Sequence, residues 1–394
     1  MDYIKITLKP GKEDSFHRFH PWVFSGAIYR FEKQPEEGDI VEVTDHQGNF
    51  IGIGQYQIGS IAVRILTFKQ EEINEQFYFK RLQEAYNVRL SLGLLNGEYN
   101  NTCRLVHGEG DNLPGLIIDL YNKTAVMQAH TPGMHYARHQ IAQALKSVLG
   151  NAIDNIYYKS ETTLPYKAEL DAENEYLLGG DAPNIATENR LKFYVDWVRG
   201  QKTGFFVDQR ENRALLERYA HGRSVLNMFC YTGRFSFYAM RGNAKLVHSV
   251  DSSSKAIDLT CKNVELNFPG DNRHQAFAED AFKFLDTMGD QYDLIILDPP
   301  AFAKHKKVLN NALQGYRKLN AKAFEKIRPG GILFTFSCSQ VVSKENFRLA
   351  VFSAAAQSGR NVRILHQLTQ PADHPVNIYH PEGEYLKGLV LYVE

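Results

Sequence analysis

Two apolar stretches in the last third of the chain each run directly into residues that can do chemistry. Residues 294–297 lead into Asp298 and two prolines, and residues 332–336 lead into Cys338 between two serines. In an open parallel sheet, ligands bind outside the carboxyl ends of the strands, so this pattern predicts a carboxylate and a thiol at one crevice. A cysteine at such a place can act as a nucleophile. The plainer alternative for Cys338 is a small buried side chain at a strand end.

Two further acids stand where earlier strands of the same sheet should end. Residues 245–250 read as a strand that ends at Asp251, and Asp280 follows the expected third strand. At these places Asp251 would accept hydrogen bonds from ribose hydroxyls and Asp280 would contact an adenine edge. Each acid alone is explained equally well as a helix N-cap or turn residue. Acids at three successive strand ends favour a ligand site.

The first strand-to-helix turn, residues 227–236, argues against a dinucleotide. It holds one glycine, Gly233, where a dinucleotide fingerprint has three. It also carries Phe229 and Tyr231, which do not offer a pyrophosphate close approach to the backbone. A nucleoside without phosphates remains open.

The elements that position these residues alternate strand and helix from about residue 186 onward. Strands are expected at 224–229, 245–250, 292–297 and 332–337, and helices at 210–220, 235–241, 255–267 and 313–327. This alternation predicts a doubly wound α/β sheet that is mostly parallel. Residues 362–365 and 387–393 are expected to form an antiparallel pair at one edge.

Two other regions precede this sheet. Residues 1–72 alternate short β-like runs with turn residues and predict a small β domain. Residues 73–185 mix strands with helices near 75–93 and 134–149, and predict an α+β domain. With residues 186–394 as the third, the chain is expected to have three domains.

Charge is balanced over the whole chain, with 45 basic and 45 acidic residues among 394. Between residues 299 and 328, however, eight basic residues accompany the single acid Glu325. A solvated helix face explains several of them. Lys304, close to Asp298 in sequence, is the candidate for a phosphate contact.

The four cysteines show no CxxC spacing and no disulfide pattern, which favours a reduced, cytoplasmic protein. Cys103 and His107 lack a second pair of ligands, so no metal site is expected. No apolar run reaches the roughly 20 residues of a membrane span, and the N-terminus does not read as a signal peptide.

Six segments spread over nearly the whole chain carry a resemblance to a known family. They are 20–24 (His-Pro-Trp-Val-Phe), 110–116 (Gly-Asp-Asn-Leu-Pro-Gly-Leu), 202–210 (Lys-Thr-Gly-Phe-Phe-Val-Asp-Gln-Arg), 231–233 (Tyr-Thr-Gly), 298–302 (Asp-Pro-Pro-Ala-Phe) and 337–339 (Ser-Cys-Ser). The pattern resembles the bacterial 23S ribosomal RNA cytosine-C5 methyltransferases, within the class I S-adenosylmethionine-dependent methyltransferases. Segment 202–210 is the most specific, whereas Asp-Pro-Pro recurs in many methyltransferases of nitrogen atoms.

The resemblance implies a Rossmann-like methyltransferase domain preceded by a PUA-like RNA-binding domain and the central α+β domain. Its implied cofactor is S-adenosylmethionine, with Phe229, Gly233, Asp251 and Asp280 lining the site and Lys202, Phe206 and Gln209 closing it. For Phe206, a buried anchoring role is an equal alternative. The implied substrate-binding residues are Pro299, Pro300, Phe302 and Lys304.

The implied reaction is methylation of C5 of a cytosine in large-subunit ribosomal RNA. C5 is a poor nucleophile, so a thiolate from Cys338 would first add at C6. Asp298, protonated or sharing a proton, would hydrogen-bond N3, and Lys304 or its basic neighbours would favour the thiolate. Many related RNA enzymes carry a second cysteine directly after the first proline of the Asp298 motif. Here Pro300 and Ala301 follow, which leaves the base for the C5 proton open.

Two rival interpretations remain. One is a methyltransferase acting on a guanine or adenine nitrogen, with Asp298, the two prolines and Phe302 binding the base. The other is an RNA-binding ribosome assembly factor without turnover. The expected partner is large-subunit ribosomal RNA. No membrane interaction is expected, and a homodimer is one possible assembly.

Overall fold

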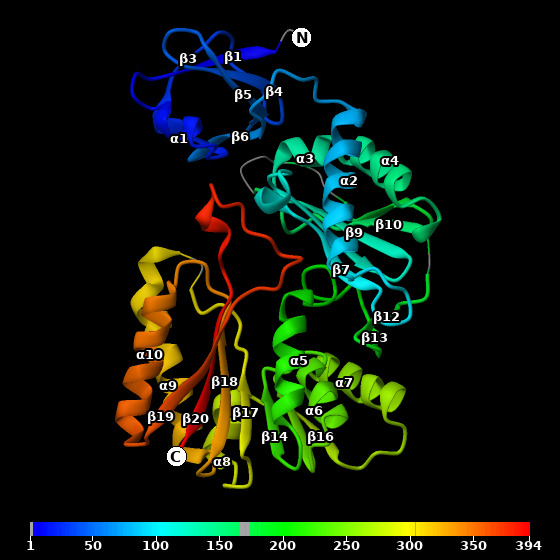
Figure 1. Cartoon of the computed structure of the whole chain (residues 1–394), viewed down its shortest axis with the longest axis vertical. Helices are drawn as coiled ribbons and strands as arrows, with labels where there is room; N and C mark the ends of the chain where they lie inside the picture. The colour runs from blue at the N-terminus through cyan, green and yellow to red at the C-terminus, as the bar shows by residue number, and fades with distance from the viewer. Residues whose placement is uncertain (1–2, 166–169, 171–172, 181, 304) are drawn as a thin grey trace. The chain divides into compact units, whose positions relative to one another are not determined.

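The computed structural model describes residues 3–165, 170, 173–180, 182–303 and 305–394. Its contacts divide the chain into two compact units. The first unit holds the chain up to Arg190, together with Val195–Val207 and Ala372–Gly383. The second unit holds Leu191–Tyr194, Asp208–Pro371 and Glu384–Glu394. In Figure 1 the first unit runs from blue to green and includes a red segment from near the C-terminus.

The first unit begins with a six-stranded sheet of order β2-β6-β5-β4-β1-β3. Its strands are β1 (Ile4–Leu8), β2 (Trp22–Phe24), β3 (Ile28–Phe31), β4 (Ile40–Thr44), β5 (Phe50–Tyr56) and β6 (Ile61–Thr67), and the short helix α1 is Asp14–His17. Ile6, Leu8, Val41 and Val43 are fully buried. Burial at every second residue is what a strand with one face on a core requires.

A five-stranded sheet of order β11-β10-β9-β8-β7 forms the rest of this unit's core. Its strands are β7 (Thr102–His107), β8 (Leu116–Tyr121), β9 (Thr124–Ala129), β10 (Asn155–Tyr158) and β11 (Glu175–Leu178), with helices α2 (Glu75–Ser91), α3 (Pro132–Tyr136) and α4 (Arg138–Leu149), and strand β12 (Ile185–Glu188). The single helix expected near 134–149 is thus two helices. The first starts early because Thr131 Oγ1 accepts the Met134 N–H at 3.3 Å and Pro132 fits the first turn.

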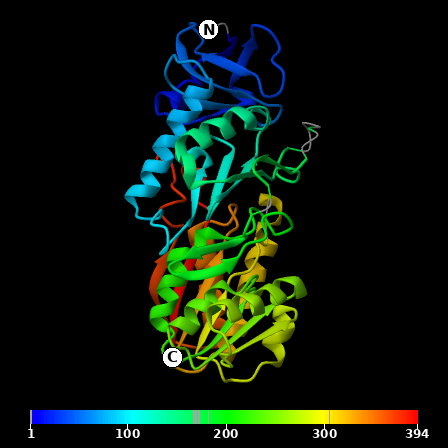
Figure 2. The ribbon, with the colours of Figure 1, turned by 90° about the vertical axis from the view of Figure 1, so that its right-hand side faces the viewer.

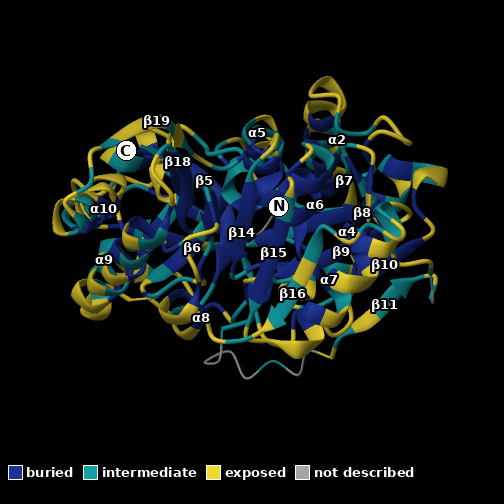
Figure 3. Cartoon of the chain, turned by 90° about the horizontal axis from the view of Figure 1, so that it is seen from below, coloured by how far each residue is buried: buried dark blue, intermediate teal, exposed yellow. Residues whose placement is uncertain are grey.

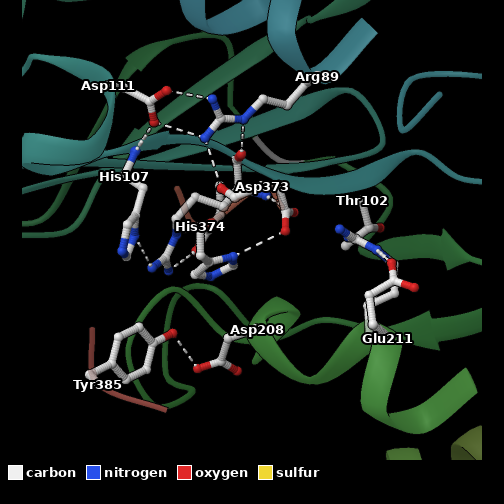
Figure 4. Close-up of polar contacts among 12 residues, drawn as sticks. Arg89, Thr102, His107, Asp111, Asp208, Glu211, Asp373, His374 and Tyr385 are labelled. Carbon is white, nitrogen blue, oxygen red and sulfur yellow. Dashed lines mark hydrogen bonds and ion pairs between the residues drawn. The ribbon is translucent and has the colours of Figure 1, made fainter. Parts of the chain in front are cut away.

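A buried ion pair explains why Ala372–Gly383 belongs to this unit. The guanidinium of Arg89, on α2, is fully buried and makes two bonds to the carboxylate of Asp111, at 2.5 and 2.8 Å. Its Nη2 also donates to the Asp373 carbonyl at 2.8 Å, and Asp373 Oδ2 accepts the Arg104 N–H at 3.0 Å. Figure 4 shows Arg89 between Asp111 and Asp373. The segment is therefore held by buried, charge-assisted hydrogen bonds.

The second unit is built on a seven-stranded sheet of order β16-β15-β14-β17-β18-β20-β19. Its strands are β14 (Ser224–Met228), β15 (Leu246–Asp251), β16 (His274–Ala278), β17 (Leu294–Leu297), β18 (Gly331–Ser337), β19 (Val362–Leu368) and β20 (Lys387–Val393). Strand β13 (Leu191–Tyr194) is not part of this sheet. Strands β14 to β18 pair in parallel, and β20 and β19 pair antiparallel at the edge. The expected mostly parallel sheet with an antiparallel edge hairpin is confirmed.

Helices cover both faces of this sheet. They are α5 (Arg210–Tyr219), α6 (Arg234–Arg241), α7 (Ser254–Asn267), α8 (Ala281–Thr287), α9 (Leu309–Lys326) and α10 (Lys344–Ser358). One continuous core joins α8, α9 and α10 to the central strands, through side chains such as Leu285, Tyr316, Phe347 and Leu333. The view in Figure 2 shows the green helices of this unit in front of its strands, and Figure 3 shows β14 and β15 buried, in dark blue. A sheet buried on both faces explains why its strands read as continuous apolar runs.

Candidate active site

The two strand ends that the sequence singled out are neighbours. Strand β17 pairs in parallel with β18, with Leu297 opposite Thr335, so Asp298 and Cys338 follow adjacent strands at the same edge of the sheet. The Sγ atom of Cys338 lies 4.0 Å from the Pro299 carbonyl oxygen. Cys338 is half-buried, whereas Cys103 and Cys230 are buried and Cys261 is exposed. Burial raises the pKa of the Cys230 thiol, which marks Cys230 as the less reactive of the two strand-end thiols.

Asp298 is held by an amide chain from α5 and the residue before it. Gln209 Nε2 donates to Asp298 Oδ1 at 3.1 Å, and Asn212 Nδ2 donates to Gln209 Oε1 at 2.6 Å. Burial and the nearby Asp208 raise the pKa of Asp298 to about 6, while Arg234, the Gln209 hydrogen bond and Arg213 oppose the shift. A carboxyl group with a pKa this close to neutrality can hold or release a proton at working pH.

Two arginines and one further aspartate form a buried charged cluster with this carboxyl group. Arg213 and Arg234 are 1% and 7% exposed, and Asp208 is 7% exposed. Tyr385 Oη donates to Asp208 Oδ2 at 2.8 Å, as Figure 4 shows. Burial and the neighbouring Arg213 lower the pKa of Arg234 to about 10, so it remains cationic at neutral pH. The sequence predicted no role for Asp208, Asn212, Arg213, Arg234 or Tyr385.

The turn between β14 and α6 has an unusual backbone. Phe229, Tyr231 and Gly233 have φ values of 56°, 50° and 79°. A Cβ on Gly233 would lie 2.4 Å from Thr260 Cγ2, so the position requires glycine. Non-glycine residues in the left-handed region store strain, and such strain clusters at ligand sites.

Asp251 fixes this turn. Its Oδ2 accepts the Tyr231 N–H and its Oδ1 accepts the Ser253 N–H, both at 2.9 Å. An ionised carboxylate has about four acceptor positions, so both oxygens retain capacity for the two ribose hydroxyls of a nucleoside. The residues present therefore fit the nucleoside part of S-adenosylmethionine.

Asp280 is exposed and is the N-cap of α8, where its Oδ1 accepts the Lys283 N–H at 3.0 Å. The capping alternative therefore describes a contact that exists, and a cofactor role for Asp280 stays a prediction.

Lys202 and Phe206 belong to the first unit, whereas Gln209 belongs to the second. Lys202 is exposed with φ 49°, and its Nζ lies 4.7 Å from the centre of the Phe206 ring. Phe206 is half-buried, and its neighbour Phe205 is the buried aromatic, at 2% exposed. Of the three closing residues, the structure brings Gln209 to Asp298.

The proposed substrate residues differ among themselves. Pro299 is buried, Pro300 is exposed, and the half-buried Phe302 ring packs at 4.7 Å from the Tyr316 ring. Lys304 lies outside the described residues. A packing contact therefore accounts for part of the Phe302 ring, and its role toward a base stays a prediction.

Lys387 is a further candidate for a functional residue, and the sequence did not predict it. It begins β20, is 6% exposed, and donates to the carbonyls of Ser339 and Val342 at 2.6 and 2.7 Å. The signal available in the sequence was a lysine directly before an apolar strand, a common arrangement that does not distinguish a buried lysine from an exposed one.

Within the part of the chain that the structure describes, no group of three or more His, Cys, Asp and Glu is arranged to hold a metal ion. None of the helices described there is long and apolar enough to cross a membrane.

Comparison with known proteins matches both parts of the chain. A family model described as a PUA-like domain matches residues 6–68, and one described as S-adenosylmethionine-dependent methyltransferase matches residues 158–381. A Tolumonas auensis protein named ribosomal RNA large subunit methyltransferase I is 41% identical over 98% of this chain and 98% of its own. A Yersinia pestis protein of the same name is 37% identical over 99% of each chain.

Among solved structures, a putative methyltransferase complexed with SAH matches 99% of this chain and 100% of its own, with a TM-score of 0.85 at 23% identity. That likeness supports the fold. The predicted fold class, including the PUA-like domain, is confirmed. The chain belongs to the S-adenosylmethionine-dependent methyltransferases, in the ribosomal RNA large subunit methyltransferase I family, and its cofactor is S-adenosylmethionine.

Proposed function

We propose that this protein methylates C5 of a cytosine in large-subunit ribosomal RNA through a covalent bond between Cys338 and C6. The relatives' name supports ribosomal RNA as the substrate. The observation that carries the choice of atom is the half-buried thiol of Cys338 on the strand beside Asp298, 4.0 Å from the Pro299 carbonyl. Methylation of a ring or exocyclic nitrogen needs no such nucleophile.

The Cys338 thiolate adds to C6, forming a C–S bond and giving C5 enamine character. S-adenosylmethionine supplies an electrophilic methyl group, which C5 attacks as the methyl–sulfonium bond breaks. A base then takes the C5 proton, and elimination across C5–C6 expels the thiolate and restores the aromatic ring.

Asp298 supports this addition electrostatically. When C6 is attacked, negative charge develops toward N3 and O2 of the ring. A carboxyl group with a pKa of about 6 holds a proton in about a tenth of free molecules at pH 7, and base binding that excludes water increases that fraction. The protonated group donates a hydrogen bond to N3 and stabilises the charge. Gln209 and Asn212 hold the carboxyl group in place for this contact.

The cofactor-binding and substrate-binding residues are also part of this proposal. Asp251 binds the ribose hydroxyls, Phe229 and Gly233 line the nucleoside, Asp280 contacts the adenine edge, and Lys202, Phe206 and Gln209 close the site. Pro299, Pro300, Phe302 and Lys304 receive the target nucleotide. The half-exposed Asp251, with both oxygens already oriented by backbone N–H groups, supports the first assignment.

The organisation we propose has three domains, 1–72, 73–185 and 186–394, with the first binding RNA. The four cysteines show no CxxC spacing and no disulfide pattern in the sequence, which supports a cytoplasmic location. For the assembly we propose a homodimer; exposed Leu349 and Phe352 on α10, at 58% and 64%, support an apolar contact there. Light scattering at micromolar concentration tests the dimer, and a monomer mass rejects it.

The deciding experiment follows transfer of a labelled methyl group from S-adenosylmethionine to large-subunit RNA that lacks its own modification. Wild type, Cys338→Ala and the matched control Cys261→Ala, at an exposed thiol of α7, are compared by nucleoside analysis. We expect labelled 5-methylcytidine from wild type and the control, and none from Cys338→Ala. Label on a purine, or full activity of Cys338→Ala, supports the nitrogen-methylating rival, and RNA binding without transfer supports the assembly factor.

A further inference from the structure

Lys387 is a buried cation whose hydrogen-bond acceptors are both uncharged. Its backbone stands opposite Ser337 in the β18–β20 pair, one residue from Cys338. Its Nζ donates to the carbonyls of Ser339 at 2.6 Å and Val342 at 2.7 Å. With 6% of its surface exposed, the ammonium has lost most of its hydration, and two neutral carbonyls restore only part of that free energy. A buried charge whose desolvation is not fully offset by its hydrogen bonds points to a function.

The charged groups near this ammonium include the thiol of Cys338. Burial lowers the pKa of Lys387 to about 8, and the charge of Cys338 opposes that shift. The exposed Lys344 on α10 lowers the pKa of Lys387 further, whereas the exposed Glu384 raises it. About nine in ten molecules therefore carry the ammonium at pH 7. The interaction is reciprocal, because an ammonium that gains from a nearby thiolate stabilises that thiolate by the same free energy.

Tyr316 and Asp298, two described neighbours of the thiol, do not supply this charge. Tyr316 of α9 accepts a hydrogen bond from Ser337 Oγ at 2.9 Å, and burial raises its pKa to about 12, so it stays neutral. Asp298, on the neighbouring strand, opposes a thiolate when it is ionised. Lys387 thus offsets burial and Asp298 at Cys338.

We propose that Lys387 is a positioning residue of the methyl-transfer reaction: it clamps the turn after β18 through two carbonyls and sets a positive charge beside the Cys338 thiolate. This inference rests on the proposed covalent mechanism. Lys387 does not touch the base or the cofactor in this role; it acts through Cys338.

The test measures the thiol directly, on the full chain without RNA. The midpoint of the pH dependence of Cys338 alkylation by iodoacetamide is read by mass spectrometry of the peptide, in a Cys261→Ser background. Cys103 and Cys230, at 0% and 5% exposed, are protected in the folded protein. Three variants separate charge from clamp: Lys387→Arg keeps the charge, Lys387→Gln keeps a donor without charge, and Lys387→Met keeps only length.

We expect Lys387→Gln and Lys387→Met to raise the midpoint by about one pH unit, which is about a tenfold smaller thiolate fraction at pH 7, and Lys387→Arg to stay near wild type. A midpoint that is unchanged in a folded Lys387→Gln variant overturns the proposal, even if that variant methylates poorly. If Lys387→Met does not fold, the comparison of Gln with Arg decides.

The two proposals fail separately. Full methylation by Cys338→Ala overturns the covalent mechanism, and with it the role of Lys387. An unshifted midpoint in the Lys387 variants overturns only the role of Lys387. If both hold, the pH profile of single-turnover methylation shifts to higher pH in Lys387→Gln by the same amount as the alkylation midpoint.

Discussion

Replacing Asp298 by Asn should make the protein more stable at neutral pH. The folded structure raises the pKa of this carboxyl from its ordinary 3.8 to about 6, so the ionised form is disfavoured in the folded state relative to the unfolded state. The wild type has its full stability below about pH 4 and loses free energy as pH rises through 6. At about 1.36 kcal/mol per pKa unit, the loss reaches about 3 kcal/mol above pH 7.

Asparagine removes the ionisation and keeps an Oδ1 acceptor for Gln209, which donates to Asp298 at 3.1 Å. The stability difference should therefore favour Asp298→Asn and grow by about 2 kcal/mol between pH 4.5 and pH 7.5. For a unit of this size, 3 kcal/mol corresponds to a rise in Tm of roughly 6 to 12 °C. Calorimetry over this pH range, with the transition of the methyltransferase unit followed, measures the effect.

The matched control is Asp280→Asn, at an exposed helix N-cap. Asparagine caps a helix about as well as aspartate, so this variant should change Tm little and without a pH trend. The reasoning about Asp298 is refuted if Asp298→Asn is less stable than wild type at pH 7.5, or if its difference from wild type is the same across the pH range.

Two further predictions concern glycine and a buried ion pair. Gly233→Ala places a Cβ 2.4 Å from a threonine methyl at φ 79° and should weaken S-adenosylmethionine binding at least tenfold, measured by calorimetry. The control Gly222→Ala, at φ 69° with open space around it, should cost only about 1 kcal/mol of stability. Equal affinities of the two variants for S-adenosylmethionine would contradict the role of this turn in cofactor binding. Arg89→Met leaves the Asp111 carboxylate buried without its cation and should destabilise the first unit by about 3 to 5 kcal/mol in urea unfolding. The control Arg241→Met removes a half-exposed ion pair and should cost under about 1 kcal/mol. A small Arg89 effect would mean that water reaches Asp111.

The strand ends could be predicted because their signal is local. Apolar runs that stop at Asp251, Asp298 and Cys338 mark both the strand and the residue that leaves it, and parallel pairing brings such ends to one edge. The edge hairpin was predictable for the same reason. Boundaries were less certain: α9 begins at Leu309 rather than near 313, because a helix start without a capping side chain leaves no mark in the sequence.

The charged cluster could not be predicted, because its signal is not local. Arg213 and Arg234 stand on helices where arginine normally reads as a solvated face, and only the folded sheet buries them near Asp208 and Asp298. The same holds for Asp373, which lies far along the chain from its partners Arg89 and Arg104.

The chain passes between its two units at five points, the last two on either side of Ala372–Gly383. This path sets an order on folding during synthesis. A ribosome releases Arg89 and Arg104 early, yet their partner Asp373 emerges only after nearly all of the methyltransferase sheet has been made. The first unit cannot be completed during synthesis until Ala372–Gly383 has been made. Until then, Arg89 lacks its hydrogen bond to the Asp373 carbonyl. A fragment that stops after Val207 would remain in that unfinished state, so the two units cannot be separated by a single cut.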